Sequence, residues 1–311
     1  MIGRFSVEHT GALAVTALAL IASPLTARPS AAQSLPDSVG VLLVAHGGEA
    51  GWNARVDSLA AAVRRGGVAR GPVAVSFLMG PAASTRRFQD QVALLVRDGA
   101  KRIVVVPVLV SSHSGHYEQI RYLAGAVDTL DDPMLHHLHM AGIERPAVSV
   151  RLAVTRALDD APEMARVLAQ RPRALAPDPA GRALFLLGHG PNSAEDYAAW
   201  MRNLRMVADS VRAQTGFASV VVDLVRDDAP RAVREEAVRR VRELIALQRA
   251  ATGSDVVVVP ILVSSGSVSA VKLPADLAGL PVRYAGDPLL PDAALARWVE
   301  RCVSEALRER P

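Results

Sequence analysis

Several features that would define common protein classes are absent from this chain. Its 311 residues include one cysteine, Cys302, so no intramolecular disulfide can form, and we read this residue as a packing side chain. Lysine occurs only at Lys101 and Lys272, and no block of like charge or basic-aromatic stripe is present, so nucleic acid is not an expected partner. No Gly-x-Ser-x-Gly pentapeptide occurs, which excludes an α/β-hydrolase.

Residues 1–32 have the pattern of a secretory signal peptide. Arg4 precedes an uncharged apolar stretch over residues 11–22, and a small-residue cleavage site ends at Ala32. No later stretch reaches about 18 uncharged apolar residues, the length that a transmembrane helix needs. We therefore expect an exported, periplasmic protein with no stable membrane insertion after cleavage. An uncleaved anchor or a misassigned start codon is the alternative.

The remainder of the chain contains the same series of motifs twice. An apolar run into His46-Gly47 is matched by one into His189-Gly190, and residues 103–112 are matched by residues 256–265. A third matched block begins at residues 150 and 282. Three blocks in one order indicate a duplicated domain. We expect an N-terminal domain over residues 33–170, a Pro/Ala-rich linker over 171–182 and a degenerate C-terminal domain over 183–311.

Strand and helix patterns alternate within each half. Short apolar runs predict strands over residues 73–78 and 219–225, in addition to the matched blocks. Amphipathic periodicity predicts helices over residues 53–65, 84–97, 194–215, 229–251 and 293–310. This alternation predicts an α/β fold: two duplicated domains, each a mostly parallel sheet flanked by helices, with a cleft between them.

Histidines follow two of the apolar runs in the first half. His46 and His113 each come just after a predicted buried strand, where open α/β sheets place their ligands. Imidazole suits Co²⁺, Ni²⁺, Fe²⁺ and Zn²⁺, and a site with two or three protein ligands keeps coordination positions open. We therefore predict that His46 and His113 bind a metal or act in catalysis. His116 can share the metal, orient His113 or accept a proton; a structural hydrogen-bonding role is the alternative for each.

The second half serves as an internal control for this hypothesis. His189 is retained, but Gly266 stands at the position of His113. We expect one active site per chain, with the second half as scaffold, substrate wall or clamp. The first half also carries an insertion after its second histidine motif, a candidate lid or wall, whose histidines we expect to be solvated: His136, His137 and His139.

The paired histidine motifs resemble those of the class II tetrapyrrole chelatases, in particular sirohydrochlorin cobaltochelatases and ferrochelatases with two fused halves. The resemblance covers residues from about 39 to 305 and includes the phrase Val-Pro-Val-Leu-Val-Ser-Ser-His-Ser-Gly-His that ends at His116. It implies insertion of Co²⁺, or alternatively Fe²⁺ or Ni²⁺, into sirohydrochlorin, an anionic macrocycle, with no organic cofactor. By the same resemblance His46 and His113 hold the metal and assist removal of the pyrrole protons. Neutral imidazole is a suitable base near neutral pH.

One position departs from the family pattern. The family commonly has Glu in a Phe-Leu-Glu phrase, and here Met79 follows Phe77-Leu78. Glu49 and Glu118 are candidate replacements. Met79 and the signal peptide favour a second hypothesis, an exported non-enzymatic metal- or tetrapyrrole-binding protein derived from a chelatase. Three arginines are candidates for the carboxylates of the macrocycle, with solvated helix-face charge as the alternative: Arg86, Arg87 and Arg121.

Overall fold

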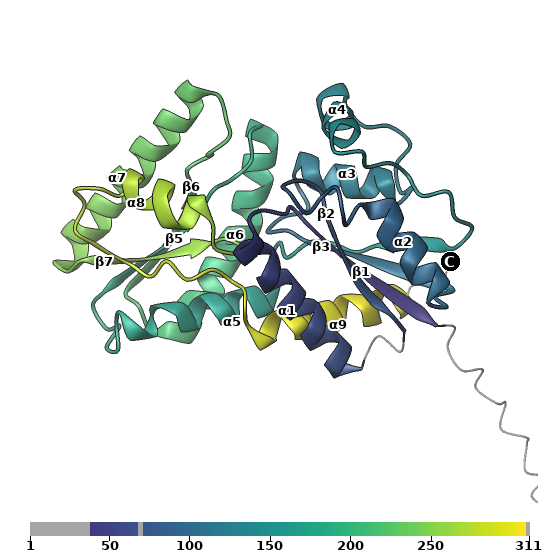
Figure 1. The fold of residues 1–311 in the computed structure, drawn as a ribbon. Coiled ribbons are helices and arrows are strands. Elements are labelled where there is room, and N and C mark those ends of the chain that lie inside the picture. The colour runs from purple at the N-terminus through teal and green to yellow at the C-terminus, as the bar shows by residue number, and fades with distance from the viewer. Residues whose placement is uncertain (1–37, 68–70, 309–311) are drawn as a thin grey trace, which may run out of the picture. The chain divides into compact units, whose positions relative to one another are not determined.

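The computed structural model describes residues 38–67 and 71–308, which contain two parallel four-stranded sheets (Figure 1). The strand order is β2-β1-β3-β4 in the first sheet and β6-β5-β7-β8 in the second. The strands are β1 Val39–Ala45, β2 Val73–Phe77, β3 Arg102–Val108, β4 Arg151–Val154, β5 Ala183–Gly188, β6 Ser219–Leu224, β7 Val256–Ile261 and β8 Val282–Tyr284. The identical order confirms the predicted α/β fold with two duplicated halves.

Valine-rich sequences form the central strands because both of their faces are covered. β1 pairs with β2 and β3, and all of its residues are buried. Pro107 lies in β3 opposite Val44, beyond residues 102–105 that pair with β4. Its missing N–H therefore removes no bond to β4. Pro260 has the same position in β7, because β8 pairs only with residues 256–258.

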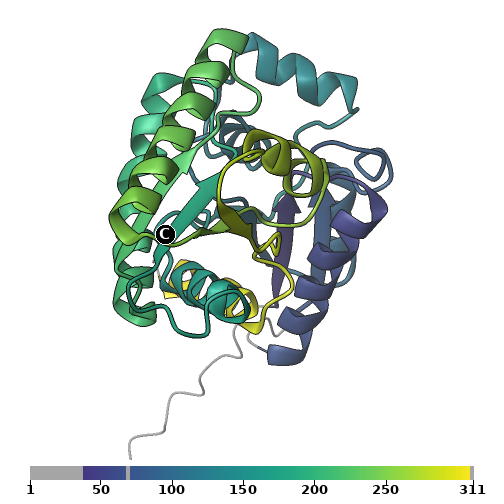
Figure 2. The same ribbon diagram turned by 90° about the vertical axis from the view of Figure 1, so that its left-hand side faces the viewer.

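Helices cover both faces of each sheet. They are α1 Ala50–Gly66, α2 Phe88–Arg97, α3 Gly115–Leu123, α4 Asp132–Met140, α5 Pro162–Gln170, α6 Ala194–Thr215, α7 Arg231–Thr252, α8 Leu273–Asp276 and α9 Ala293–Arg308. Side chains of α1, α5, α6 and α9 share one core with a face of each sheet. Helices α2, α3 and α4 cover the other face of the first sheet, and α7 and α8 that of the second. Figure 2 shows α7 and α1 on opposite sides of the view.

The C-terminal helix packs against the first half of the chain. Helix α9 contacts α1, α5 and β3, and Arg301 on α9 forms an ion pair of 2.8 Å with Glu163 on α5. The segment predicted as a linker begins with a short 3₁₀ helix, η1 Arg171–Ala174. Arg171 donates to the carbonyl oxygens of Pro288 and Leu289, which ties this segment to the chain before α9. The predicted division at residues 171–182 stays a prediction.

Most predicted elements are confirmed, with shifts at their ends. The predicted helix over 194–215 has the bounds of α6, because Ser193 caps its first turn by accepting from Asp196 N at 3.0 Å and Gly216 adopts the left-handed conformation after its last. The prediction of helix from residue 84 was wrong for its first turn, since residues 81–86 form turns before α2. The apolar run predicted to continue through residue 112 leaves the sheet after Val108.

The predicted signal peptide, residues 1–32, lies outside the described residues. Within residues 38–67 and 71–308, no helix combines the length and the apolar character needed to cross a membrane.

Candidate functional site

The backbone around His46 is fixed by the strand beside it. Leu78 N donates to Ala45 O (3.1 Å) and Met79 N donates to His46 O (2.9 Å), so the contact between the β1 and β2 segments continues past the ends of both strands. Gly47 has φ of +93°, and a Cβ on it would lie 2.1 Å from Met79 O, so only glycine fits here. The glycine after the strand therefore sets where the His46 imidazole leaves the sheet.

His189 leaves the second sheet by the same arrangement. Val225 N donates to Gly188 O (3.0 Å) and Asp227 N donates to His189 O (3.1 Å), as Leu78 and Met79 do in the first half. The following glycine, Gly190, also has a positive φ, +83°. The repeated sequence thus gives the same local geometry twice.

The loop between β3 and α3 is anchored by a buried carboxylate. Asp159, whose side chain is 1% exposed, accepts from Ser112 N (2.7 Å) and from Ser112 Oγ (2.7 Å). Ser114 then caps α3 by accepting from Tyr117 N at 3.3 Å. These contacts fix the start of α3, and His116 lies in its first turn.

A cavity of about 380 Å³ lies where the strand ends of the two halves meet. Its lining includes three histidines, two tryptophans and two aspartates: His46, His116, His189, Trp52, Trp200, Asp227 and Asp228. The His46 and His116 rings lie 4.8 Å apart between centroids, with an interplanar angle of 81°. The structure therefore brings together imidazoles from the first half and the matching imidazole of the second half, His189.

Hydrogen bonds determine which nitrogen of each first-half imidazole carries a proton. His46 Nδ1 lies 2.9 Å from Gly47 O, and His116 Nδ1 lies 2.8 Å from Gln119 Oε1. Carbonyl oxygens only accept, so in both rings Nδ1 is the donor and Nε2 of the neutral ring keeps its lone pair. Such a lone pair is what metal binding or proton acceptance requires.

Burial keeps these imidazoles neutral. Burial, together with the neighbouring His46, lowers the pKa of His116 to about 4, against the opposing hydrogen bond to Gln119. The pKa values of His46 and His189 are also lowered, in each case chiefly by burial. Near neutral pH the three rings are therefore unprotonated at one nitrogen and available to a cation.

The histidines predicted from sequence have different surroundings. His113 does not line the cavity, and its main-chain carbonyl accepts from Trp200 Nε1 at 2.5 Å. The role of His113 as a metal ligand stays a prediction. His136 and His139 are exposed on α4, as expected for solvated side chains, whereas the His137 ring lies 5.7 Å from that of His116.

None of the arginine candidates lines this cavity. Each is paired with a carboxylate on the first half: Arg86 with Asp57 (2.5 Å), Arg87 with Asp90 (2.7 Å) and Arg121 with Glu118 (3.0 Å). Glu118 is thus paired with Arg121 and does not line the cavity. Glu49 lines the cavity as an exposed side chain, and Met79 does not line it.

Two aspartates at the cavity were missed by the sequence analysis. Asp227 and Asp228 follow β6, the strand that corresponds to β2, so their loop corresponds to the one that carries Met79. Asp227 is held by Lys272 (2.7 Å) and Arg234 (3.4 Å). Asp228 raises the pKa values of His46 and His116 through its charge, against the effect of burial. Aligning the sequences of the two halves places the Asp227–Asp228 loop and the Met79 loop after equivalent strands. This correspondence could have identified the two aspartates as candidate site residues.

In the described residues no three His, Cys, Asp or Glu side chains are already arranged to hold a metal ion. The His46 and His116 imidazoles lie together at the cavity. Two imidazoles leave most coordination positions of a divalent ion open.

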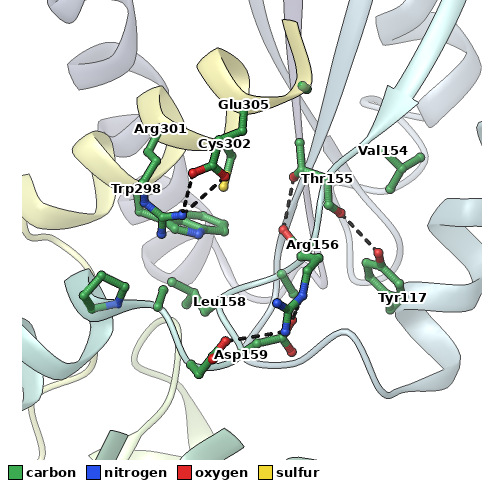
Figure 3. Close-up of a pocket in the computed structure, with 15 residues that line it drawn as sticks. Tyr117, Val154, Thr155, Arg156, Leu158, Asp159, Trp298, Arg301, Cys302 and Glu305 are labelled. Carbon is green, nitrogen blue, oxygen red and sulfur yellow. Dashed lines mark hydrogen bonds and ion pairs between the residues drawn. The ribbon is translucent and has the colours of Figure 1, made fainter. Parts of the chain in front are cut away.

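A second cavity, of about 530 Å³, lies between the end of β4 and α9 (Figure 3). No histidine lines it, and its guanidinium groups are neutralised by ion pairs: Arg156 with Asp159 and Asp160, Arg301 with Glu163 and Glu305. Burial raises the pKa of the Cys302 thiol to about 11, so this sulfur is not a thiolate at neutral pH. The side chains that can bind a metal ion or accept a proton are therefore those of the histidine-lined cavity.

Comparison with known proteins finds similarity to chelatases, in agreement with the resemblance of the histidine motifs. Residues 40–175 match the CbiX family model. SirB from Bacillus subtilis with Fe³⁺ is 16% identical, with a TM-score of 0.59 over 87% of this chain and 96% of that one. The sirohydrochlorin chelatase SirB from Bacillus subtilis subspecies spizizenii in complex with cobalt is 16% identical, with a TM-score of 0.57 over 86% and 95%.

A third solved structure extends the comparison to a larger protein. DR2241 from Deinococcus radiodurans, a multi-domain protein with structural similarity to chelatases, is 21% identical, with a TM-score of 0.53 over 88% of this chain and 56% of that one. Among curated protein sequences, none matches the chain. At these identities the solved structures establish the two-halved chelatase fold.

Proposed function

Because residues 40–175 match the CbiX family model and the histidine motifs resemble those of the class II chelatases, we propose that this protein inserts a divalent metal, Co²⁺ in the first instance, into sirohydrochlorin or a related tetrapyrrole. One observation carries the proposal. His46 and His116 line the same cavity with their rings 4.8 Å apart, and both have Nδ1 engaged as a donor and Nε2 unprotonated. Imidazole binds Fe²⁺ and Ni²⁺ as well, so these ions are the alternatives.

The chemistry of insertion matches this pair. When a divalent ion enters the macrocycle, four metal–nitrogen bonds form and two pyrrole N–H bonds break, so two protons must be accepted. In the proposed reaction His46 and His116 hold the entering ion through Nε2, then release it to the macrocycle and accept the protons. Their lowered pKa values favour release of those protons to water afterwards.

The second half contributes to the same cavity in this proposal. His189, Trp200 and the Asp227–Asp228 loop face the first half across it. Asp228 supplies the negative charge that the family's glutamate would provide from the Met79 position. The negative charge of the Asp228 carboxylate stabilises a cation held between the His46 and His116 imidazoles.

An exported metal- or tetrapyrrole-binding protein without turnover is the second candidate function. Met79 favours it, since a thioether sulfur cannot accept a pyrrole proton. Such a binder would use the same histidines and hold its ligand in the same cavity.

An anaerobic assay separates the two functions. Purified protein is mixed with sirohydrochlorin and Co²⁺, Fe²⁺ or Ni²⁺, and the absorbance of the macrocycle is followed. We expect insertion to be faster than the uncatalysed rate, with Co²⁺ as the preferred ion. Binding of the metal or the macrocycle without acceleration would leave the binding function and remove the chelatase.

A further inference from the structure

Gln119 on α3 connects a cavity histidine to the inserted helix. Its side chain is fully buried and lies one turn after His116. Gln119 Oε1 is 2.8 Å from His116 Nδ1, whereas Nε2 is 2.8 Å from Met134 O and 3.1 Å from His137 Nδ1. All the contacts of this amide are therefore made to His116 or to α4.

The orientation of the Gln119 amide follows from the contact to Met134. A main-chain carbonyl can only accept, so the NH₂ group of Gln119 must face Met134 O and its oxygen must face His116. The second amide hydrogen goes to His137 Nδ1, which then accepts. Since Gln119 Oε1 also only accepts, the proton of His116 is held on Nδ1.

Helix α4, which supplies Met134 and His137, is itself packed firmly on the first half. Asp131 caps it by accepting from Met134 N at 2.8 Å, and Leu138 is buried in the core beneath it. Met134 also lies against the start of α3, where a Cβ on Gly115 would come within 2.6 Å of its sulfur. These contacts make α4 a support for the first turn of α3. The insertion was predicted to be a lid or a wall, and its packing is that of a wall.

We propose that Gln119, held by α4, is a positioning residue that keeps His116 in its Nδ1–H form and so leaves Nε2 free for the metal. The inference rests on the proposed function for the identity of the metal, but the position of the proton is independent of it. Without the Gln119 oxygen, the partly buried His116 Nδ1–H loses its acceptor, and the ring gains by rotating or by moving its proton to Nε2. Loss of such an outer hydrogen bond typically costs about 10- to 100-fold in metal affinity.

The test compares Gln119→Met with Gln119→Glu. Two-bond ¹H–¹⁵N spectra of the histidine rings give the protonated nitrogen of His116, whose signal is identified by its loss in His116→Gln. We expect Nδ1–H in the unmodified protein and in Gln119→Glu, which keeps an acceptor oxygen, and a shift toward Nε2–H in Gln119→Met. Calorimetric titration with Co²⁺ should show affinity weakened about 10- to 100-fold in Gln119→Met and retained in Gln119→Glu.

Gln248→Met is the matched control. Gln248 is also buried, and its Nε2 donates to Leu184 O (3.1 Å) and Ser219 Oγ (2.9 Å) in the second half, with no part in the histidine cavity. This variant should be less stable, but the protonated nitrogen of His116 and the affinity for Co²⁺ should both be unchanged. An Nε2–H form in the unmodified protein, or an unchanged tautomer and affinity in Gln119→Met, would overturn the inference. Absence of any Co²⁺ binding by the unmodified protein would instead remove the proposed function, and the ring spectra would still decide the positioning role.

Discussion

Replacing either His46 or His116 by alanine should lower the rate of metal insertion by about 10²- to 10⁴-fold, the range that a positioned acid–base group contributes. Each change removes one of the two imidazoles that the proposed reaction uses to hold the ion and accept the protons. The remaining ring cannot both hold the ion and accept the protons. The measurement is the initial rate of the absorbance change with sirohydrochlorin and Co²⁺.

Two further variants make this result specific. His139→Ala is the control, since His139 is an exposed histidine on α4, and its rate should equal that of the unmodified protein. His113→Ala separates the sequence hypothesis from the structural one. A small effect at His113 with large losses at His46 and His116 agrees with the cavity described above, whereas a large loss at His113 and none at His116 would contradict it.

Acidification should destabilise the folded protein by about 2 kcal/mol between pH 7.5 and pH 5 through His116 alone. The pKa of His116 is about 4 in the folded state and 6.5 without its surroundings. As the pH falls below 6.5 the unfolded chain takes up a proton that the folded protein does not, so the free energy of unfolding falls until the pH reaches about 4. The lowered pKa values of His46 and His189 act in the same direction.

Urea denaturation at the two pH values measures this effect. In His116→Gln, which has no titrating group at this position, the drop in the free energy of unfolding should be smaller by about 2 kcal/mol. Equal pH dependence in the two proteins would show that burial does not hold His116 neutral. Burial would then no longer support the assignment of an unprotonated Nε2 to His116 at neutral pH.

The fold could be predicted from the sequence because its signals are local and occur twice. Runs such as Val39–Ala45 and Val256–Ile261 have the continuous apolar pattern of strands covered on both faces, and glycines follow the histidines where the backbone must turn. The sequence pattern did not reveal that α9 packs against the first half, since an amphipathic face does not specify its partner.

The site was harder to predict because it depends on loop geometry and on contacts between distant segments. The apolar run after Pro107 leaves the sheet at Val108, and the anchored loop brings His116 to the cavity. Asp228 and Gln119 carried no motif. The place of Asp228 at the cavity depends on how the two halves of the chain meet. The role of Gln119 depends on its hydrogen bonds to the inserted helix α4.

The central claim is that the metal enters between His46 and His116. A crystal of the protein soaked with Co²⁺, measured on both sides of the cobalt absorption edge, locates the ion by its anomalous signal. We expect one strong peak within bonding distance of the Nε2 atoms of His46 and His116, on the side of the cavity that Asp228 faces. A peak on His113 or on the exposed histidines of α4, with none between His46 and His116, would contradict the account.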